Sequence, residues 1–266
     1  MRASFADFFQ GICISILLAG CSIPRIYVPA GYHQDIIYQP KPTSRDTVRS
    51  ATYLSAGFKT HSNPNYQDRL LSGQLALSRG YVFNHFNIAY GSFLELGEYR
   101  TSGMLVADPD FFQKKYFGDF GAHLSANLFA TSGLADIRYL GLEAAYSHEF
   151  GRFAQFRKMV LQDNTYAVDP RQDLFSLGLT SEIIFSRETF QFGFREFVGS
   201  TFGSNNLDRF NYSYRKLTIY HGYTDKLRSG YWNNVFPKSS FFVKIHHYYG
   251  TIEFAHMWLF TSGYSF

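Results

Sequence analysis

Four histidines late in the chain are the residues that most readily suggest chemistry, because facing imidazoles can bind a metal ion. They are His221, His246, His247 and His256. His246 and His247 are consecutive, and consecutive side chains on a strand point to opposite faces. At most a subset of the four can therefore converge. We expect these histidines to be structural, and we predict no metal site.

A second candidate is a group of oxygen ligands of the kind that Ca²⁺ takes, namely Asp163, Asn164, Asp169 and Asp173. Their spacing is not that of an EF-hand loop, so we interpret them as part of a solvated loop. The chain also lacks a Gly-rich phosphate loop, a G-x-S-x-G elbow and an H-E-x-x-H motif. We predict neither an enzyme nor a bound cofactor.

Six charged residues form the third candidate, because they fall on the polar faces of predicted strands. Three are acidic, and three are cations that we expect to lie opposite them: Glu95, Glu143, Glu182, Arg195, Lys216 and Lys244. An unpaired charge inside a closed interior is costly, which favours a structural network of ion pairs. A selective pore lining or a catalytic carboxylate is the functional alternative.

The elements that position these residues are strands, because apolar and polar residues alternate with period two. The clearest case is 118–130, where Phe120, Leu124 and Leu128 share one face and Asp119, His123 and others share the opposite face. Similar alternation predicts about ten strands, with eight to twelve allowed: 50–59, 69–79, 82–97, 118–130, 137–149, 172–186, 188–198, 213–221, 240–249 and 251–261.

The composition predicts how these strands assemble. Aromatic residues make up 19% of the chain, with 29 Phe and 20 Tyr, yet no apolar run is long enough to span a membrane as a helix. The polar faces carry mainly Gly, Ser, Thr and Asn, as a narrow barrel interior requires. We therefore predict an all-β, antiparallel up-and-down membrane barrel over residues 48–266. The net charge of +4 is scattered, which argues against a nucleic-acid partner.

The predicted connections alternate between long and short, as in outer-membrane barrels with short periplasmic turns and long external loops. The links 61–68, 98–117, 151–171 and 199–212 are long. The order then fails, since 223–239 is long where a short turn is expected and Gly250 marks a tight turn where a long loop is expected. Either an excursion exists there, or a strand near Tyr231 to Phe236 is miscounted.

The amino-terminal residues predict export. A short apolar run from Phe8 ends in Ala19-Gly20-Cys21, which resembles the lipobox of a bacterial lipoprotein signal. This resemblance implies that residues 1–20 are removed and that Cys21 carries lipid. Residues 21–47 contain four prolines and read as an extended tether between the lipid and the first strand. No cysteine would then remain for a disulfide or a thiolate site.

Even-numbered aromatic residues continue from Phe254 to Phe266, and a last strand that ends in Phe resembles the signal read by the outer-membrane barrel-assembly machinery. With the lipobox and tether, the whole chain resembles the poorly characterised outer-membrane β-barrel lipoproteins of Bacteroidota. That resemblance implies an outer-membrane lipid anchor, and the order of connections places Cys21 on the periplasmic side. We expect a structural or loop-mediated interaction role. The alternatives are a transport pore, a membrane-embedded enzyme that acts on lipid, and a tethered lipocalin-like barrel that binds an apolar ligand.

Overall fold

The computed structural model describes residues 26–62, 68–101, 114–162, 167–187, 189–202, 235–255 and 258–266. Several sequence-based predictions lie outside these residues: the signal peptide, Cys21, the strand 213–221 with Lys216 and His221, the loop residues Asp163 and Asn164, and His256.

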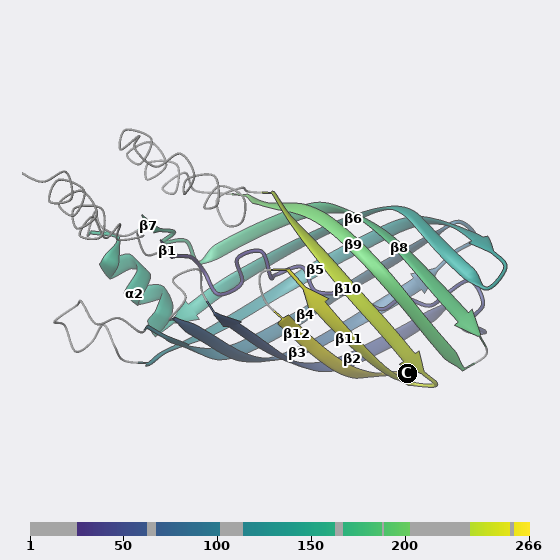
Figure 1. The fold of residues 1–266 in the computed structure, drawn as a ribbon, viewed down its shortest axis with the longest axis horizontal. Coiled ribbons are helices and arrows are strands. Elements are labelled where there is room, and N and C mark those ends of the chain that lie inside the picture. The colour runs from purple at the N-terminus through teal and green to yellow at the C-terminus, as the bar shows by residue number, and fades with distance from the viewer. Residues whose placement is uncertain are drawn as a thin grey trace, which may run out of the picture.

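Ten strands of the described chain close into one antiparallel barrel, shown in Figure 1, as the sequence predicts. Each barrel strand pairs with the next barrel strand along the chain, which gives nine pairs. The last strand pairs with the first and closes the ring. The strands are β2 (Ser50–Ser62), β3 (Arg69–Val82), β4 (Phe86–Arg100), β5 (Lys114–Ser132), β6 (Ala135–Gly151), β8 (Asp173–Arg187), β9 (Phe190–Phe202), β10 (Val235–Ile245), β11 (Tyr248–Phe254) and β12 (Trp258–Ser265).

The barrel has two different ends. At the short-turn end the strands are joined by residues 83–85, 133–134, 188–189 and 246–247, whereas at the long-loop end the chain between strands runs over 63–68, 101–113, 152–172, 203–234 and 255–257. The long-loop end also carries the helix α2 (Arg152–Val160) and a small parallel pair of β1 (Ile26–Tyr27) and β7 (Ala167–Val168), which Figure 1 shows beyond the barrel. No helix among the described residues is long and apolar enough to cross a bilayer.

The strand assignment near the carboxyl terminus differs from the prediction. The sequence suggests one strand over 240–249 and another over 251–261, but the structure turns at His246 and His247 and begins new strands at Tyr248 and Trp258. His246 takes the left-handed conformation (φ 53°) that such a tight turn requires. Outward apolar residues fall on odd positions before this turn (Phe241, Ile245) and on even positions after it (Ile252, Phe254), so a change of phase in the sequence marks the turn. With β10 beginning at Val235, long and short connections alternate as far as β11, and the last connection, 255–257, is as short as the turn 83–85.

Candidate functional site

The outside of the barrel is apolar and the inside is polar. Leu124 and Leu128 on β5 are 54% and 43% exposed, whereas Ser125 and Asn127 between them are buried. The same alternation runs along the other strands, because successive side chains of a strand point to opposite faces. The predicted outward face of 118–130 is therefore confirmed. A lipocalin-like barrel would need these leucines inside, so the structure contradicts that alternative.

The candidate site is the interior of this barrel, because a segment of the chain fills it. Residues 27–43 are almost all buried, and Figure 1 shows the segment running through the barrel from the long-loop end toward the short-turn end. We call residues 27–46 the plug. The sequence predicts a tether over residues 21–47 that lies between the lipid and the barrel, and the structure corrects this for most of the described part: residues 28–43 run inside the barrel.

At the long-loop end, aromatic side chains hold the beginning of the plug. The ring of Tyr27 packs edge-on against Phe156 of α2 and Tyr99 of β4, with centroid separations of 5.2 and 6.2 Å. The backbone NH of Ala30 donates a hydrogen bond to Glu149 of β6, with 2.5 Å between the heavy atoms. Arg157 of α2 pairs with the same carboxylate. Through Arg157, the helix α2 therefore holds Glu149, which accepts the hydrogen bond from the plug.

Near the long-loop end, the plug also passes very close to the wall of the barrel. A Cβ atom added to Gly31 would lie 2.4 Å from a carboxylate oxygen of Asp119 on β5. A residue with a side chain would therefore displace either the plug or Asp119, which explains glycine at this position.

In the middle of the barrel, charged groups on the wall bind the backbone of the plug. Lys238 of β10 donates a hydrogen bond to the carbonyl of Ile36 at 2.6 Å. Glu253 of β11 accepts one from the NH of Tyr38 at 2.9 Å, and Lys238 lies 3.2 Å from that carboxylate. The Tyr38 hydroxyl donates to Glu182 of β8. The wall thus satisfies the Ile36 carbonyl and the Tyr38 NH, two buried backbone groups of the plug.

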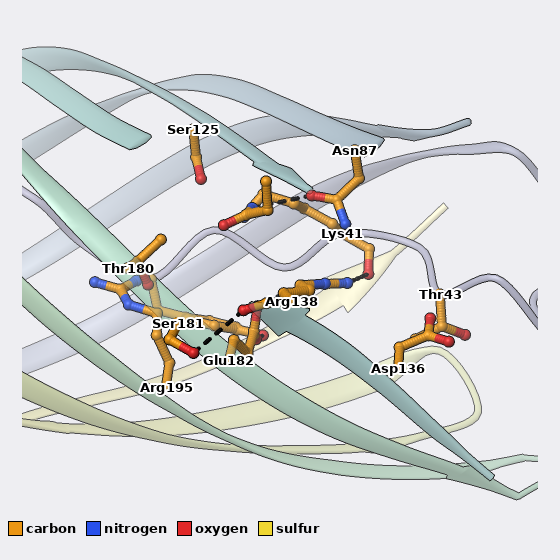
Figure 2. A network of polar contacts seen from close by, with 12 residues as sticks. Lys41, Thr43, Asn87, Ser125, Asp136, Arg138, Thr180, Ser181, Glu182 and Arg195 are labelled. Atoms are coloured by element: carbon orange, nitrogen blue, oxygen red, sulfur yellow. Dashed lines mark hydrogen bonds and ion pairs between the residues drawn. The ribbon is translucent and has the colours of Figure 1, made fainter. Parts of the chain in front are cut away.

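Toward the short-turn end, Arg138 of β6 connects the wall to the plug. Its guanidinium lies 2.5 Å from a Glu182 oxygen and 3.4 Å from the carbonyl of Lys41. Figure 2 shows Arg138 beside Lys41 of the plug. Still closer to the short-turn end, the NH and hydroxyl of Ser44 donate hydrogen bonds to Asp136, at 2.7 and 2.5 Å. The plug then leads into β2 at the short-turn end. Ile26 and Ser50 consequently lie at opposite ends of the barrel.

The six residues of the predicted charge network have different positions. Glu95, Glu143, Glu182 and Arg195 are all buried in the interior. Of these, the structure pairs only Arg195 with Glu143, at 3.4 Å. Lys244 lies 6.0 Å from the ring of Tyr53 and forms no ion pair with another described residue, and Lys216 lies outside those residues.

The remaining partners were missed by sequence reasoning. Glu95 pairs with Lys59 of β2 at 2.5 Å, and Glu182 with Arg138. Glu149–Arg157 and Lys238–Glu253 are two further buried pairs. Lys59 and Glu253 occupy inward positions of predicted strands, so the period-two pattern was sufficient to find these two. Arg157 lies on a helix, where that pattern gives no information.

The other candidate ligands do not form a site in the described part of the chain. His246 and His247 occupy the turn between β10 and β11, and the His247 ring contacts the carbonyl of Ser265 at 3.0 Å. Asp169 binds Arg171, and Asp173 contacts His148 at 2.8 Å. Among the described residues, no three His, Cys, Asp or Glu side chains gather as metal ligands.

Comparisons with known proteins give fold likenesses only. No family model and no curated protein matches the chain. Among solved structures, it is similar to Neisserial surface protein A (11% identity, TM-score 0.34, covering 82% of this chain and 98% of that one). It is also similar to the translocator domain of the autotransporter NalP from Neisseria meningitidis (6%, 0.29, 84% and 88%) and to CdiB from Acinetobacter baumannii (10%, 0.26, 82% and 60%). Likenesses this weak carry no argument about function.

Proposed function

We propose that this chain is an outer-membrane β-barrel lipoprotein that is closed by its own plug and acts as a structural or loop-mediated interaction protein rather than as an enzyme or a pore. The observation that carries the proposal is the distribution of side chains, which is the reverse of that in a soluble protein. Leucine and phenylalanine cover the outside of a closed ring of strands, while charged groups and a buried segment fill the inside. A bilayer favours this arrangement, because closed strands leave no unsatisfied edge in the hydrocarbon.

The buried polar interior supports a filled barrel rather than an open pore. The wall contributes several ion pairs whose side chains are at most 4% exposed, including Lys59–Glu95, Arg138–Glu182 and Arg195–Glu143. Buried charges of this kind are stable only when they are paired and hydrogen-bonded. The plug supplies part of that bonding, and it occupies the path that a solute would take.

The path of the plug changes the expected position of the lipid. In outer-membrane barrels the short turns face the periplasm and the long loops face outward. Ile26 lies at the long-loop end, and it is five positions from Cys21, a chain length of at most about 18 Å. We therefore propose a lipid at Cys21 on the outer side. This proposal replaces the periplasmic placement expected from the sequence.

The lipid at Cys21 and the apolar outside of the barrel would each hold the protein in the membrane, and their separate contributions can be tested. Several acyl chains anchor a protein stably, but a barrel with an apolar outside needs no lipid to remain in the bilayer. The experiment is to express Cys21→Ala and wash isolated membranes with alkaline carbonate. The proposal predicts that the variant stays in the outer-membrane pellet. Its release into the supernatant would contradict a membrane-spanning barrel.

Assembly is the remaining part of the proposal. Phe266 exchanges backbone hydrogen bonds with Thr52, at 2.9 and 3.4 Å, and so extends the seam between β12 and β2 where the barrel closes. Its side chain is 69% exposed. An exposed aromatic residue at the closing seam is suited to recognition by the barrel-assembly machinery. That recognition would complete export of the lipoprotein.

A further inference from the structure

Three cations form a row on the outside of the barrel at its long-loop end. Arg69 on β3 pairs in register with Arg100 on β4, which pairs in register with Lys114 on β5. All three point outward, and the side chains of Arg100 and Lys114 are 51% and 49% exposed. Neighbouring strands are about 4.8 Å apart, so the row is roughly 10 Å long.

The charge of this row is only partly balanced. Glu98 lies one outward position below it and binds both Arg100 at 2.5 Å and Lys114 at 3.4 Å. Arg69 has no carboxylate within ion-pair distance in the part of the chain that the structure describes. Like charges that face each other across strands are destabilising. Three cations against one carboxylate therefore favour an external anion.

The rest of the outer surface lacks such a row among the described residues. At the same end, His148 on β6 is matched by Asp173 on β8 at 2.8 Å. At the short-turn end, Arg79 and Arg187 also point outward, but Arg79 lies over the ring of Tyr81 at 5.3 Å, and neither residue is paired in register with another cation. The excess of positive charge is thus specific to β3, β4 and β5.

The surface below the row is apolar. Leu71 on β3 and Tyr116 on β5 flank Glu98 at the next outward positions and are 42% and 58% exposed, and Leu96, one outward position farther along β4, is 56% exposed. A ligand with a negative headgroup and hydrocarbon chains would contact both zones, whereas a free anion would contact only the row. Cations near a membrane surface bind anionic headgroups in this way.

We propose that Arg69, Arg100 and Lys114 bind the phosphate groups of an anionic lipid, with its acyl chains on the apolar surface below. This site rests on the proposed function, because the row must lie at a membrane boundary. The orientation proposed above places it at the outer leaflet. The ligand class is therefore a phosphorylated membrane amphiphile, and the site would fix lipid beside the long loops.

The test is native mass spectrometry of the detergent-solubilised full chain with phosphorylated lipid A, dephosphorylated lipid A or inorganic phosphate as the probe. The wild type is expected to retain the phosphorylated lipid most strongly. The triple variant Arg69→Gln/Arg100→Gln/Lys114→Gln should bind it roughly 100-fold more weakly, from about 1 kcal/mol for each cation near the surface. The matched control is Arg79→Gln/Arg187→Gln, which should bind as the wild type does.

Other results would overturn the site. Equal retention of dephosphorylated lipid would show that phosphate is not recognised, and competition by inorganic phosphate at the lipid concentration would contradict a lipid ligand. Glu98→Gln removes the one carboxylate of the row and should strengthen binding, so weaker binding would also count against the proposal. Insertion into vesicles, measured in parallel, separates these outcomes from a failure of the barrel itself.

Discussion

The hydroxyl of Tyr38 in the plug donates a hydrogen bond to the carboxylate of Glu182 on the barrel wall. Arg138 binds the same carboxylate from β6. A buried carboxylate with two donors, one from the plug and one from the wall, joins the segment to the barrel at mid-depth.

Tyr38→Phe should therefore loosen the plug. Hydrogen bonds to charged groups contribute about 1.5–3 kcal/mol, so we expect the free energy of unfolding to fall by that amount. Urea unfolding in vesicles, followed by tryptophan fluorescence, measures the change. The matched control is Tyr146→Phe, which removes an outward hydroxyl that donates to Asp173 at 2.6 Å. If both variants unfold alike, the Tyr38 contact has no special role.

Lys238 is the second connection, because it binds the Ile36 carbonyl and the Glu253 carboxylate together. Lys238→Met should leave Glu253 as a buried charge without its cation. Removing one partner of a buried pair costs about 3–5 kcal/mol. Adding Glu253→Gln should recover part of this loss, because no charge is then left buried. Thermal unfolding of the single and double variants makes the comparison, and a double variant less stable than Lys238→Met would refute the coupling.

Substitutions at two heights on the outside of the barrel test whether this surface faces lipid. Leu124 is halfway along β5 and faces outward, whereas Leu134 lies in the turn between β5 and β6 at the short-turn end. A cation at the bilayer midplane of a barrel costs about 2–4 kcal/mol, and one near the interface about 0–1 kcal/mol. Leu124→Arg should therefore destabilise the barrel in vesicles much more than Leu134→Arg. Equal losses would argue against a lipid-facing surface.

The direction of the plug predicts which side of the membrane exposes the amino-terminal residues. A protease cleavage site inserted directly before Ile26 should be cut when protease is added to intact cells. The same site inserted between Thr47 and Val48, near the start of β2, should be cut only after the outer membrane is opened. Protection of the first site in intact cells would reverse the proposed placement of Cys21.

The sequence predicts the barrel because its signal is local. Leu124 and Asn127 show their faces by alternation alone, and the recurrence of this pattern predicts a barrel of about ten strands, although not every strand boundary. The plug could not be predicted in the same way. Pro29, Pro40 and Pro42 exclude a ladder of strand hydrogen bonds, and polar residues such as His33 and Asp35 resemble those of a solvated linker.

What places the plug inside is pairing over long sequence separations. Ile36 and Lys238 are 202 positions apart, and Tyr38 and Glu253 are 215 apart. No periodicity in a single sequence reports such contacts. The same limit applies to the ion pairs: Glu182 was recognisable as an inward residue, but its partner Arg138 was identified only by the structure.

Conductance in planar bilayers tests the central claim that the plug closes the barrel. The account predicts that the full chain is non-conducting and that a variant lacking residues 27–46 forms discrete channels, provided that circular dichroism shows it to be folded as strands. A double variant that weakens the plug without deleting it, Tyr38→Phe/Lys238→Met, should open intermittently. A full chain that conducts steadily, with the same single-channel conductance as the deletion variant, would contradict the account.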